Sequence, residues 1–459
     1  MKTYRLDNTA KLYPAVAEKK NPCVFRLSAV LTEGIDPDAL QQAADITIKR
    51  FPTMAVKLRK GLFWCSLAEN NNPLTVRKES ASPCSPILGV KEDNDHLLRI
   101  LYYGRRMTVE CFHALTDGMG AMEFLKSLLY QYLLFTGREV QDEGMLLLPQ
   151  NPPEPQEEED GCLRYYQKHA RKSKLEERQA HAIAGTVLKD RRTKVIHGVV
   201  PAAPLRDYAR RHGTTITGYL AAVFAQAIDS SGSQQGRSRH PVRIVIPVNL
   251  RGIFPSKTLR NFVTQVSVSL PAASGQTIDD MVESVTSQMK AAVTEEHLSG
   301  KISAYVGYEK MLAGRMIPWL IKKTAISLVS KRVYGATTAL LTNLGDVKLP
   351  KSMEQYVEMI EVVPSPKKSA SINCGICSVG GKLNIAFAGN IAEPDVIERF
   401  FELIAQQTGL EAALYSNGWL KSGMQPAGER SLYPPYTAAF EQTGRVRPIP
   451  AKASQFYPL

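Results

Sequence analysis

The twelve residues 107–118, MTVECFHALTDG, change their hydrophobic period at a histidine. One face of an expected strand carries Met107, Val109, Cys111 and His113. Beyond His113, apolar residues recur at helical spacing. The segment therefore predicts a strand that ends at His113, a turn with Asp117 and Gly118, and a helix over 118–135. Such junctions suit catalytic groups, because a rigid element delivers the side chain while the turn leaves it accessible.

The size and composition of the chain indicate a globular protein with more than one domain. Its 459 residues exceed one ordinary core, and 44% hydrophobic with 22% charged residues is typical of globular chains. Neither a run of about 18 apolar residues nor an apolar signal region is present. Seven scattered cysteines do not make a disulfide framework. We therefore expect a cytoplasmic protein, with peripheral membrane association left open.

The net charge of +13 predicts attraction to anions. Zinc-finger spacing, aromatic RNA-binding motifs and basic zippers are absent from the sequence, so nucleic acid is not an expected partner. A diffusely basic protein is the simpler interpretation. Cys374 and Cys377 form a lone CxxC inside an expected strand, which does not predict a zinc site. Because no glycine-rich phosphate loop occurs either, we expect no metal and no nucleotide cofactor apart from a substrate.

Residues 149–161, PQNPPEPQEEEDG, combine proline with an acidic run and indicate a linker. A polar, basic stretch from Leu163 to Lys194 follows it, for which we expect a helix. The predicted organisation is an N-terminal lobe over 1–150, a linker and connecting helix over 151–194, a C-terminal lobe over 195–415 and an irregular tail over 416–459.

Two segments of the expected C-terminal lobe carry specific predictions. Residues Ile278–His297 are expected to form one long helix. The basic segment Tyr305–Lys331 contains the apolar run MIPWLI, which suits a membrane surface or the lining of an acyl tunnel. An ordinary amphipathic helix packed on the second lobe is the simpler expectation.

Three further segments are PVNLRGIF (247–254), LRNFV (259–263) and TNLGD (342–346). Together with HALTDG (113–118), and in this order, they resemble the chloramphenicol-acetyltransferase-like acyltransferase superfamily. That group includes plant BAHD acyltransferases, nonribosomal-peptide condensation domains, polyketide-associated acyltransferases and alcohol acetyltransferases. The resemblance extends over roughly Tyr4–Leu410. The segments DNTAKLYP and GIDPDALQQAADITIKRFP are similar to the start of bacterial alcohol-acetyltransferase-like members.

The resemblance implies an α/β (α+β) fold of two lobes, each with a mixed sheet flanked by helices, and an active-site channel between them. It implies that His113 is a general base in mid-channel. It also implies that Asp117 pairs with an arginine of the second lobe, for which Arg251 is our candidate. From the residues alone Asp117 could instead orient the imidazole ring directly. Gly118 is expected to provide a backbone conformation or a close approach that a side chain would block.

The TNLGD segment is implied to lie near the channel, so Thr342, Asn343 and Gly345 are candidate substrate-binding residues. The donor to a tetrahedral oxyanion stays open between Thr342, Asn343 and a backbone amide. Histidine suits the base because its ordinary pKa is about 6.5, and the following helix N-terminus should keep the ring neutral. Many relatives carry a second histidine where this chain has Phe112, which weakens a condensation-domain assignment.

The expected function is acyl-CoA-dependent O-acyl transfer, of an acetyl or longer acyl group, to an alcohol. Its partners would be acyl-CoA and the alcohol, with a carrier protein and a membrane surface left open. One alternative is an N-acyltransferase or condensation-type enzyme that forms an amide from a carrier-bound donor. The other is a non-catalytic acyl-binding relative.

Overall fold

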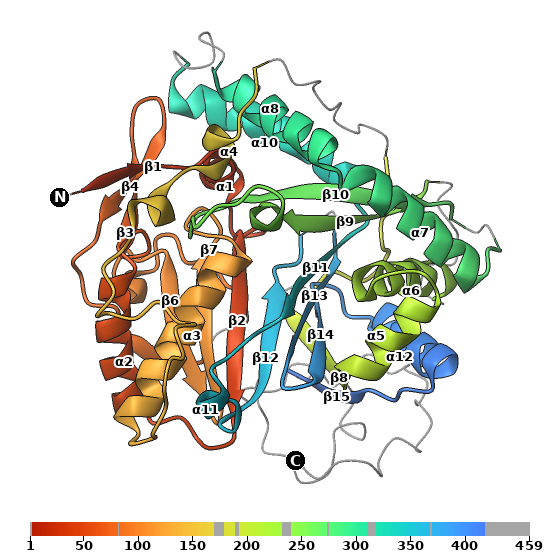
Figure 1. Cartoon of the computed structure of the whole chain (residues 1–459). Coiled ribbons are helices and arrows are strands. Elements are labelled where there is room, and N and C mark those ends of the chain that lie inside the picture. Colours follow the sequence, from red (N-terminus) through yellow and green to blue (C-terminus); the bar gives the residue numbers. More distant parts are fainter. Residues whose placement is uncertain are drawn as a thin grey trace.

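The computed structural model describes residues 2–80, 82–168, 179–188, 192–231, 240–272, 275–310, 317–367 and 370–417. This part of the chain forms a mixed α/β structure whose two halves lie side by side in Figure 1. The first half is drawn in red to yellow and the second in green to blue. The predicted fold class, with two lobes of mixed sheets flanked by helices, is confirmed. The predicted tail lies outside the described residues from 418 onward.

A five-stranded sheet with the order β12-β2-β7-β6-β5 forms the centre of the first half. These strands are Val357–Pro364, Val24–Leu31, Arg106–Phe112, Leu98–Tyr103 and Val76–Lys78. Strand β12 comes from the second half of the sequence and pairs antiparallel with β2 (Figure 1). The expected lobe of residues 195–415 is therefore not self-contained, because β12 completes the sheet of the other lobe. Hydrogen bonds between distant segments fix this exchange, and no local pattern encodes it.

Two helices of the first half begin at an aspartate that caps them. Helix α2 (Pro37–Arg50) begins at Asp36, whose side chain accepts from the backbone amides of Asp38 and Ala39. Helix α3 (Gly118–Phe135) spans the predicted range and has Asp117 as its N-cap. The two helices pack together, with the Phe51 ring edge-on to Phe124.

A smaller sheet with the order β1-β4-β3 lies beside the first half. Its strands are Thr3–Arg5, Cys65–Glu69 and Val56–Lys60. The short helical segments of the described residues are α1 (Tyr13–Val16), α4 (Gly161–Arg164), α11 (Lys351–Glu354), η1 (Ala10–Leu12), η2 (Lys91–Asp93), η3 (Pro155–Glu158) and η5 (Leu250–Gly252).

The second half is built on a seven-stranded sheet with the order β10-β9-β11-β13-β14-β8-β15. These strands are Val263–Leu270, Val242–Asn249, Ala339–Asp346, Ile372–Val379, Lys382–Gly389, Lys194–Pro201 and Ala413–Ser416. Its helices are α5 (Ala202–Arg211), α6 (Ile216–Ser230), α7 (Ile278–Ala292), α8 (Glu295–Lys310), α10 (Trp319–Gly335) and α12 (Asp395–Thr408). In Figure 1 helices α5, α6, α7 and α12 lie to the right of this sheet. No helix of the described residues is long and apolar enough to cross a membrane.

Three helix predictions for the second half of the chain are corrected by the structure. The helix over 278–297 is two helices, because Thr294 starts a new one by accepting from the backbone amide of His297. The basic segment 305–331 likewise belongs to α8 and α10, with 311–316 outside the described residues. Helix α10 packs on α1 of the first half, and its Trp319 joins the core of that half, so it does not pack as an ordinary helix on the second lobe.

The connecting helix expected over 163–194 is also absent where the structure describes this segment. Only α4 is helical, and residues 179–188 form no helix or strand apart from an isolated bridge at Val187. Their backbone bonds to the second half: Leu188 N donates to Asn390 O (2.9 Å), and Val187 bridges to Ile391. The physical reason is that this polar stretch has no apolar stripe to bury as a helix, whereas its backbone groups find partners on neighbouring chain. Residues 169–178 lie outside the described part.

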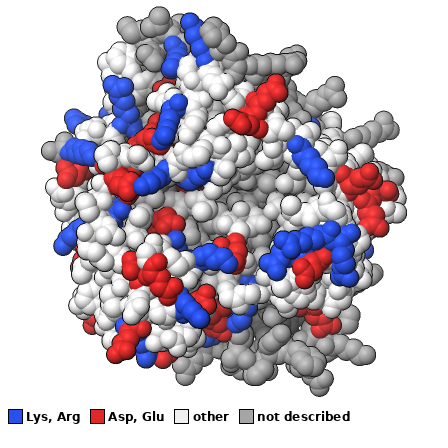
Figure 2. All heavy atoms as spheres, in the orientation of Figure 1, with Lys and Arg blue, Asp and Glu red and all other residues white. Residues whose placement is uncertain are grey.

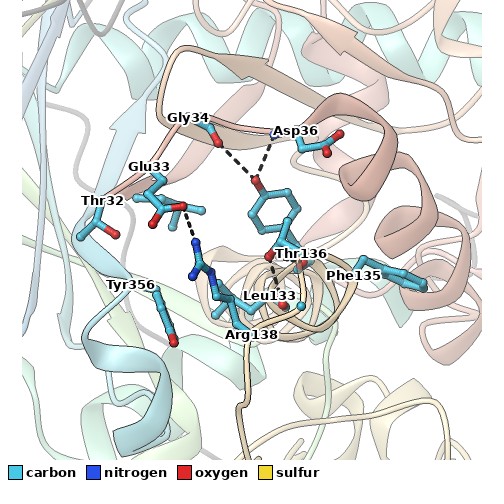
Figure 3. Close-up of a pocket in the computed structure, with 12 residues that line it drawn as sticks. Thr32, Glu33, Gly34, Asp36, Leu133, Phe135, Thr136, Arg138 and Tyr356 are labelled. Atoms are coloured by element: carbon cyan, nitrogen blue, oxygen red, sulfur yellow. Dashed lines mark hydrogen bonds and ion pairs between the residues drawn. The ribbon is translucent and has the colours of Figure 1, made fainter.

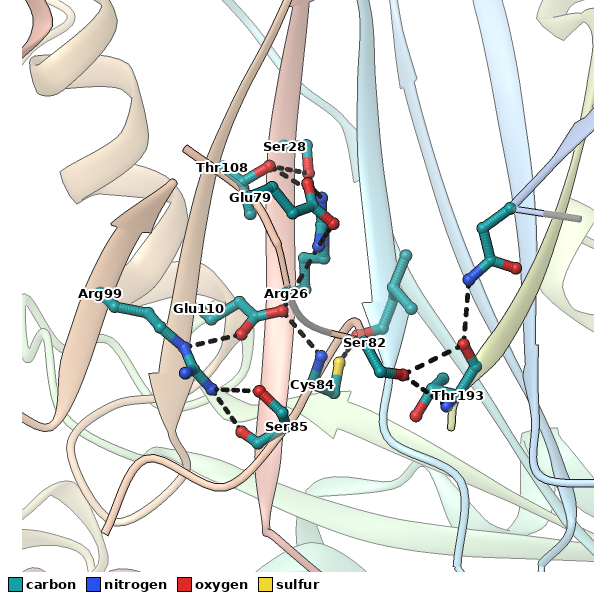
Figure 4. Close-up of polar contacts among 12 residues, drawn as sticks. Arg26, Ser28, Glu79, Ser82, Cys84, Ser85, Arg99, Thr108, Glu110 and Thr193 are labelled. Carbon is teal, nitrogen blue, oxygen red and sulfur yellow. Dashed lines mark hydrogen bonds and ion pairs between the residues drawn. The ribbon is translucent and has the colours of Figure 1, made fainter. Parts of the chain in front are cut away.

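Charged side chains fill one face of the five-stranded sheet (Figure 4). Buried Arg26 forms a two-pronged ion pair with buried Glu79 (2.6 and 2.8 Å). Glu110 of β7 accepts from Arg99 Nε at 2.9 Å and from the backbone amide of Cys84 at 2.7 Å. These partners explain why Glu110 can be buried in the strand that precedes His113. A buried carboxylate needs paired charges and hydrogen-bond donors. The network therefore braces the strand that carries His113.

The surface charge agrees with a diffusely basic protein on the face drawn in Figure 2. There Lys and Arg side chains lie among Asp and Glu side chains over most elements. The net charge of +13 therefore does not gather into one basic patch on this face.

Burial of His197 predicts a loss of stability in acid. Burial lowers the pKa of this imidazole from 6.5 to about 4, although Glu361 opposes the shift. Between pH 6.5 and about 4 the unfolded chain binds the proton and the folded chain does not. The free energy of unfolding therefore decreases as the pH is lowered through this range. The loss approaches roughly 3 kcal/mol near pH 4. We expect His197→Gln to remove this part of the pH dependence in urea unfolding at pH 7.5 and 4.5. Identical pH dependence in both proteins would contradict it.

Candidate active site

His113 follows the last residue of β7, where the chain turns toward α3. Its backbone amide donates to Cys23 O at 2.8 Å, which ties the turn to the residue before β2. The imidazole ring stacks on Tyr13 of α1, with ring centres 4.4 Å apart and planes 10° apart. Phe25 of β2 closes another side at 4.9 Å. The residue as a whole is partly exposed, and these two aromatic neighbours hold the imidazole ring in place.

Two residues that the sequence analysis did not assign to the site fix the ring nitrogens of His113. His113 Nδ1 lies 3.2 Å from Asn261 Oδ1. Asn261 Nδ2 in turn donates to Asp7 Oδ2 at 3.2 Å. Asp7 also accepts from the backbone amide of Ala10 at 2.7 Å and lies 3.7 Å from Arg260 Nε. The result is a chain of contacts from Asp7 through Asn261 to the histidine.

This chain of contacts assigns the protonation of the ring. A carboxylate only accepts hydrogen bonds, so the Asn261 amide group must turn its NH₂ toward Asp7. The carbonyl oxygen of Asn261 then faces His113 Nδ1, which must carry the proton of the neutral ring. Nε2 is left with its lone pair. His113 is therefore arranged to accept a proton at Nε2, as a general base does.

The surroundings of His113 favour the neutral ring. Burial lowers the pKa of the imidazole below 6.5, and the Lys367 ammonium lowers it further. The ring's own backbone carbonyl, the Asp117 carboxylate and Asn261 raise the pKa without reversing the shift. A base needs a free lone pair, so the lowered pKa keeps His113 competent at neutral pH.

Asp117 serves the turn and the lobe interface. One carboxylate oxygen accepts from the backbone amides of Met119 and Gly120, both at 3.1 Å, and caps α3. The other accepts from Arg251 Nη1 and from the backbone amide of Phe262, both at 2.8 Å. The predicted pair of Asp117 and Arg251 is thus formed. Asp117 braces the turn against the second lobe, and Asn261 contacts the ring in its place.

Arg251 is held as firmly as its partner. Its Nε donates to Thr258 O at 3.0 Å, and Nη2 donates to Arg260 O at 2.6 Å. The guanidinium therefore links the Asp117 turn to the segment that carries Asn261. A single ion pair thus holds both the His113 turn and the segment of Asn261.

The glycines after Asp117 permit close packing. A Cβ on Gly118 would lie 2.8 Å from Leu344 Cδ2, so the predicted close approach is found here against the TNLGD segment. Gly120 is tighter, because its Cβ would lie 2.2 Å from Leu259 O and from Thr116 Oγ1. A side chain at position 120 would therefore clash with backbone of the second half, whereas one at position 118 would displace the end of the Leu344 side chain.

The TNLGD segment lies beside this turn through Leu344, and its candidate residues have different surroundings. Asn343 Nδ2 donates to Thr217 Oγ1 at 3.0 Å, and its Oδ1 accepts from Gly345 N at 2.8 Å. Gly345 has φ +78°, which accounts for glycine there. Thr342 is half-buried in β11, opposite Gly375 of β13. The side chain of Asn343 thus shapes its own turn, and substrate contact by these three residues stays a prediction.

The CxxC cysteines belong to the core. Cys374 and Cys377 are buried in β13, and burial raises the pKa of both thiols. Cys377 Sγ donates to Ile360 O at 3.1 Å. Within the described ranges, no group of three or more His, Cys, Asp or Glu residues is placed to hold a metal ion.

A cavity of about 460 Å³ opens at the opposite end of α3 (Figure 3). There Tyr132 OH accepts from the backbone amide of Asp36, and Arg138 lies over the Tyr356 ring. Helix α3 has 18 residues, which separates its two ends by roughly 27 Å. The cavity is therefore distinct from the His113 site.

No protein-family model matches the sequence, and no match is found among curated proteins. The structure is similar to polyketide synthase associated protein 5 from Mycobacterium tuberculosis, with a TM-score of 0.59 and 16% identity. That comparison covers 88% of this chain and 97% of the other.

Two further solved structures are similar over most of both chains. TRI101 of F. graminearum, complexed with coenzyme A and deoxynivalenol, has a TM-score of 0.59 at 11% identity, covering 90% of this chain and 100% of its own. The starter condensation domain of rhizomide synthetase RzmA, complexed with C8-CoA and Leu-SNAC, has a TM-score of 0.52 at 13% identity, covering 89% and 94%. The chain therefore shares the fold of these three structures, one of which is a condensation domain.

Proposed function

We propose that the protein is an acyl-CoA-dependent O-acyltransferase with His113 as its general base. The observation that carries the proposal is the contact chain Asp7–Asn261–His113, which leaves Nε2 free to take a proton. The intact Asp117–Arg251 brace supports the same assignment. Structures of this fold include TRI101 complexed with coenzyme A and deoxynivalenol, and TRI3 trichothecene 15-O-acetyltransferase, which supports an alcohol as acceptor.

The proposed reaction uses one base twice. His113 Nε2 removes the hydroxyl proton as the alcohol oxygen attacks the thioester carbonyl carbon. The tetrahedral intermediate then collapses, the carbon–sulfur bond breaks, and the departing thiolate takes the proton from Nε2. The products are an ester and free coenzyme A, and His113 returns to its neutral form. A base of this kind contributes about a hundred- to ten-thousand-fold to the rate.

The experiment that tests the function measures free thiol released from acyl-CoAs of different chain length in the presence of alcohols. We expect release that requires both substrates, with the ester identified by mass spectrometry. We also expect at least one acyl-CoA to raise the melting temperature, because a ligand that binds only the folded state stabilises it. Failure of every acyl-CoA to do so would contradict the proposal.

Amide formation is the second candidate. The similar condensation domain is complexed with C8-CoA and Leu-SNAC, and the same base would serve an amine. Phe112 is fully buried in the position where condensation domains carry another histidine, which favours the alcohol. Assays with amines in place of alcohols separate the two candidates.

Asp7 and Asn261 give a prediction about positioning residues. Replacing Asp7 with Asn removes the anion that turns the Asn261 NH₂ away from the ring, so the amide can flip and present a donor to Nδ1. The tautomer with Nε2 protonated is then favoured, and that ring is a poor base. We expect kcat to fall at least tenfold, an order-of-magnitude estimate, with the KM for acyl-CoA nearly unchanged.

Stability should respond differently from activity in this variant. Burial raises the pKa of Asp7 to about 6, so its charged form costs the fold stability as the pH rises through 6. Asp7→Asn should therefore keep its melting temperature at pH 7.5 while kcat falls. Unchanged kcat, or equal losses of activity and stability, would contradict a positioning role.

A further inference from the structure

Helix α10 turns its apolar side chains outward. Leu320, Ile321, Leu328 and Val329 are between 57% and 77% exposed. Their spacing places them in one stripe along the helix, with exposed Thr324 and Ala325 between them. The inward side instead carries Trp319 and two buried polar residues, Lys322 and Ser330. This is the reverse of a helix that only covers a core.

The turn between β3 and β4 extends the stripe. Its Leu62 is 72% exposed, and Phe63 beside it is also exposed. Trp319 N donates to Leu62 O at 2.8 Å, and Lys322 Nζ donates to Phe63 O at 3.1 Å while lying 3.6 Å above the Trp64 ring. The turn and the start of α10 therefore form one fixed surface. We call it the α10 surface, defined by Leu62, Phe63, Ile317, Leu320, Ile321, Leu328 and Val329.

Positive charge borders the α10 surface. The sequence of α10, WLIKKTAISLVSKRVYG, contains basic residues and no acidic one. Lys323 is exposed, as are Arg59 and Lys60 at the end of β3. Lys60 is the last residue of β3 and pairs with Cys65 at the start of β4, and Lys323 follows Lys322, which bonds to Phe63 O in the turn between them, so both basic residues belong to the turn end of the hairpin. An apolar surface with a basic border is suited to the interface of an anionic bilayer.

We propose that the α10 surface docks on an anionic phospholipid bilayer. Leu62, Leu320 and Ile321 enter the boundary between headgroups and acyl chains, while Lys60 and Lys323 meet the phosphates. A second copy of the chain is a poorer occupant, because a symmetric contact brings the same positive charges together. Helix α10 packs on α1, whose Tyr13 stacks on His113, so docking sets the bilayer one short helix away from the base.

The test is flotation of the full-length protein with vesicles of phosphatidylcholine alone or with about one third phosphatidylglycerol. We expect binding to the anionic vesicles and little to the neutral ones. Leu320→Ser with Ile321→Ser should reduce the bound fraction at least tenfold, and Lys60→Glu with Lys323→Glu should act similarly, as order-of-magnitude estimates. The matched control is Leu134→Ser with Val187→Ser, two exposed apolar residues outside the surface, which should bind like the wild type.

Several outcomes would overturn the proposal. They are the absence of wild-type binding to anionic vesicles, full binding by the Leu320/Ile321 variant, and an equal loss in the control. Analytical sedimentation without lipid tests the remaining alternative. If the wild type is a dimer, the Leu320/Ile321 variant is a monomer and neither binds vesicles, the α10 surface is a contact between two copies of the chain. The melting temperatures should agree, because the changed residues are exposed. Since flotation measures binding without turnover, its result is independent of the proposed acyl transfer.

Discussion

Replacing His113 with alanine should lower the rate of acyl transfer by about a hundred- to ten-thousand-fold. The reason is that the contact of Nδ1 with Asn261 leaves the lone pair on Nε2 free to accept a proton. The alanine variant has no base in this position. Thiol release at saturating acyl-CoA and alcohol measures the effect. Because the pKa of His113 is lowered from 6.5, the ring gains its proton only below this pH. The wild-type rate should therefore decline only below pH 6.5.

His212 provides a matched control for this variant. It is exposed at the end of α5, where its ring faces Asp279 at 3.2 Å. His212→Ala should leave turnover unchanged, and both variants should melt near the wild type. Turnover retained by His113→Ala would remove the base from the proposal, whatever the fold.

Replacing Arg251 with alanine should lower the free energy of unfolding by about 3 kcal/mol, the lower end for breaking a buried pair. Asp117 is 1% exposed and would keep its backbone donors while losing the guanidinium. The same change frees the Thr258 and Arg260 carbonyls next to Asn261, so kcat should fall as well. Urea unfolding and thiol release measure the two effects.

The exposed pair of Lys257 and Glu154 is the control for Arg251. Its atoms lie 2.8 Å apart, but more than half of the lysine and half of the glutamate side chain face solvent. Such pairs contribute little, so Lys257→Ala should leave unfolding and turnover near the wild type. A normal urea midpoint together with normal turnover in Arg251→Ala would refute the brace.

Local patterns predicted those parts of the molecule that depend on near neighbours in the chain. Helix α3 has its predicted bounds, because its apolar spacing and the turn with Asp117 and Gly118 lie close together in the chain. The long helix over 278–297 was wrong, because apolar spacing continued through a threonine that starts a second helix. The spacing of apolar residues shows which face of a helix is apolar, but it does not show which hydroxyl group caps the start of a new helix.

Asn261 and Asp7 show the limit of the sequence for the site. Both lie in segments, LRNFV and DNTAKLYP, that the resemblance singled out, yet neither carried a role. They lie 254 residues apart and meet only because β10 and the chain after β1 converge at the His113 turn. The Asp117–Arg251 pair could be anticipated because the resemblance implied it, whereas the role of Asn261 needed coordinates.

The sequence by itself predicted the strand–turn–helix at His113 from periodicity, and the resemblance in motif order implied the two-lobed mixed α/β fold and the candidate base. Only the tertiary structure decided that β12 completes the sheet of the first half, which nitrogen of His113 is free, and which way α10 faces. The physical reason is that strand pairing, the direction of a hydrogen bond and the burial of a helix face each depend on a partner distant in the chain.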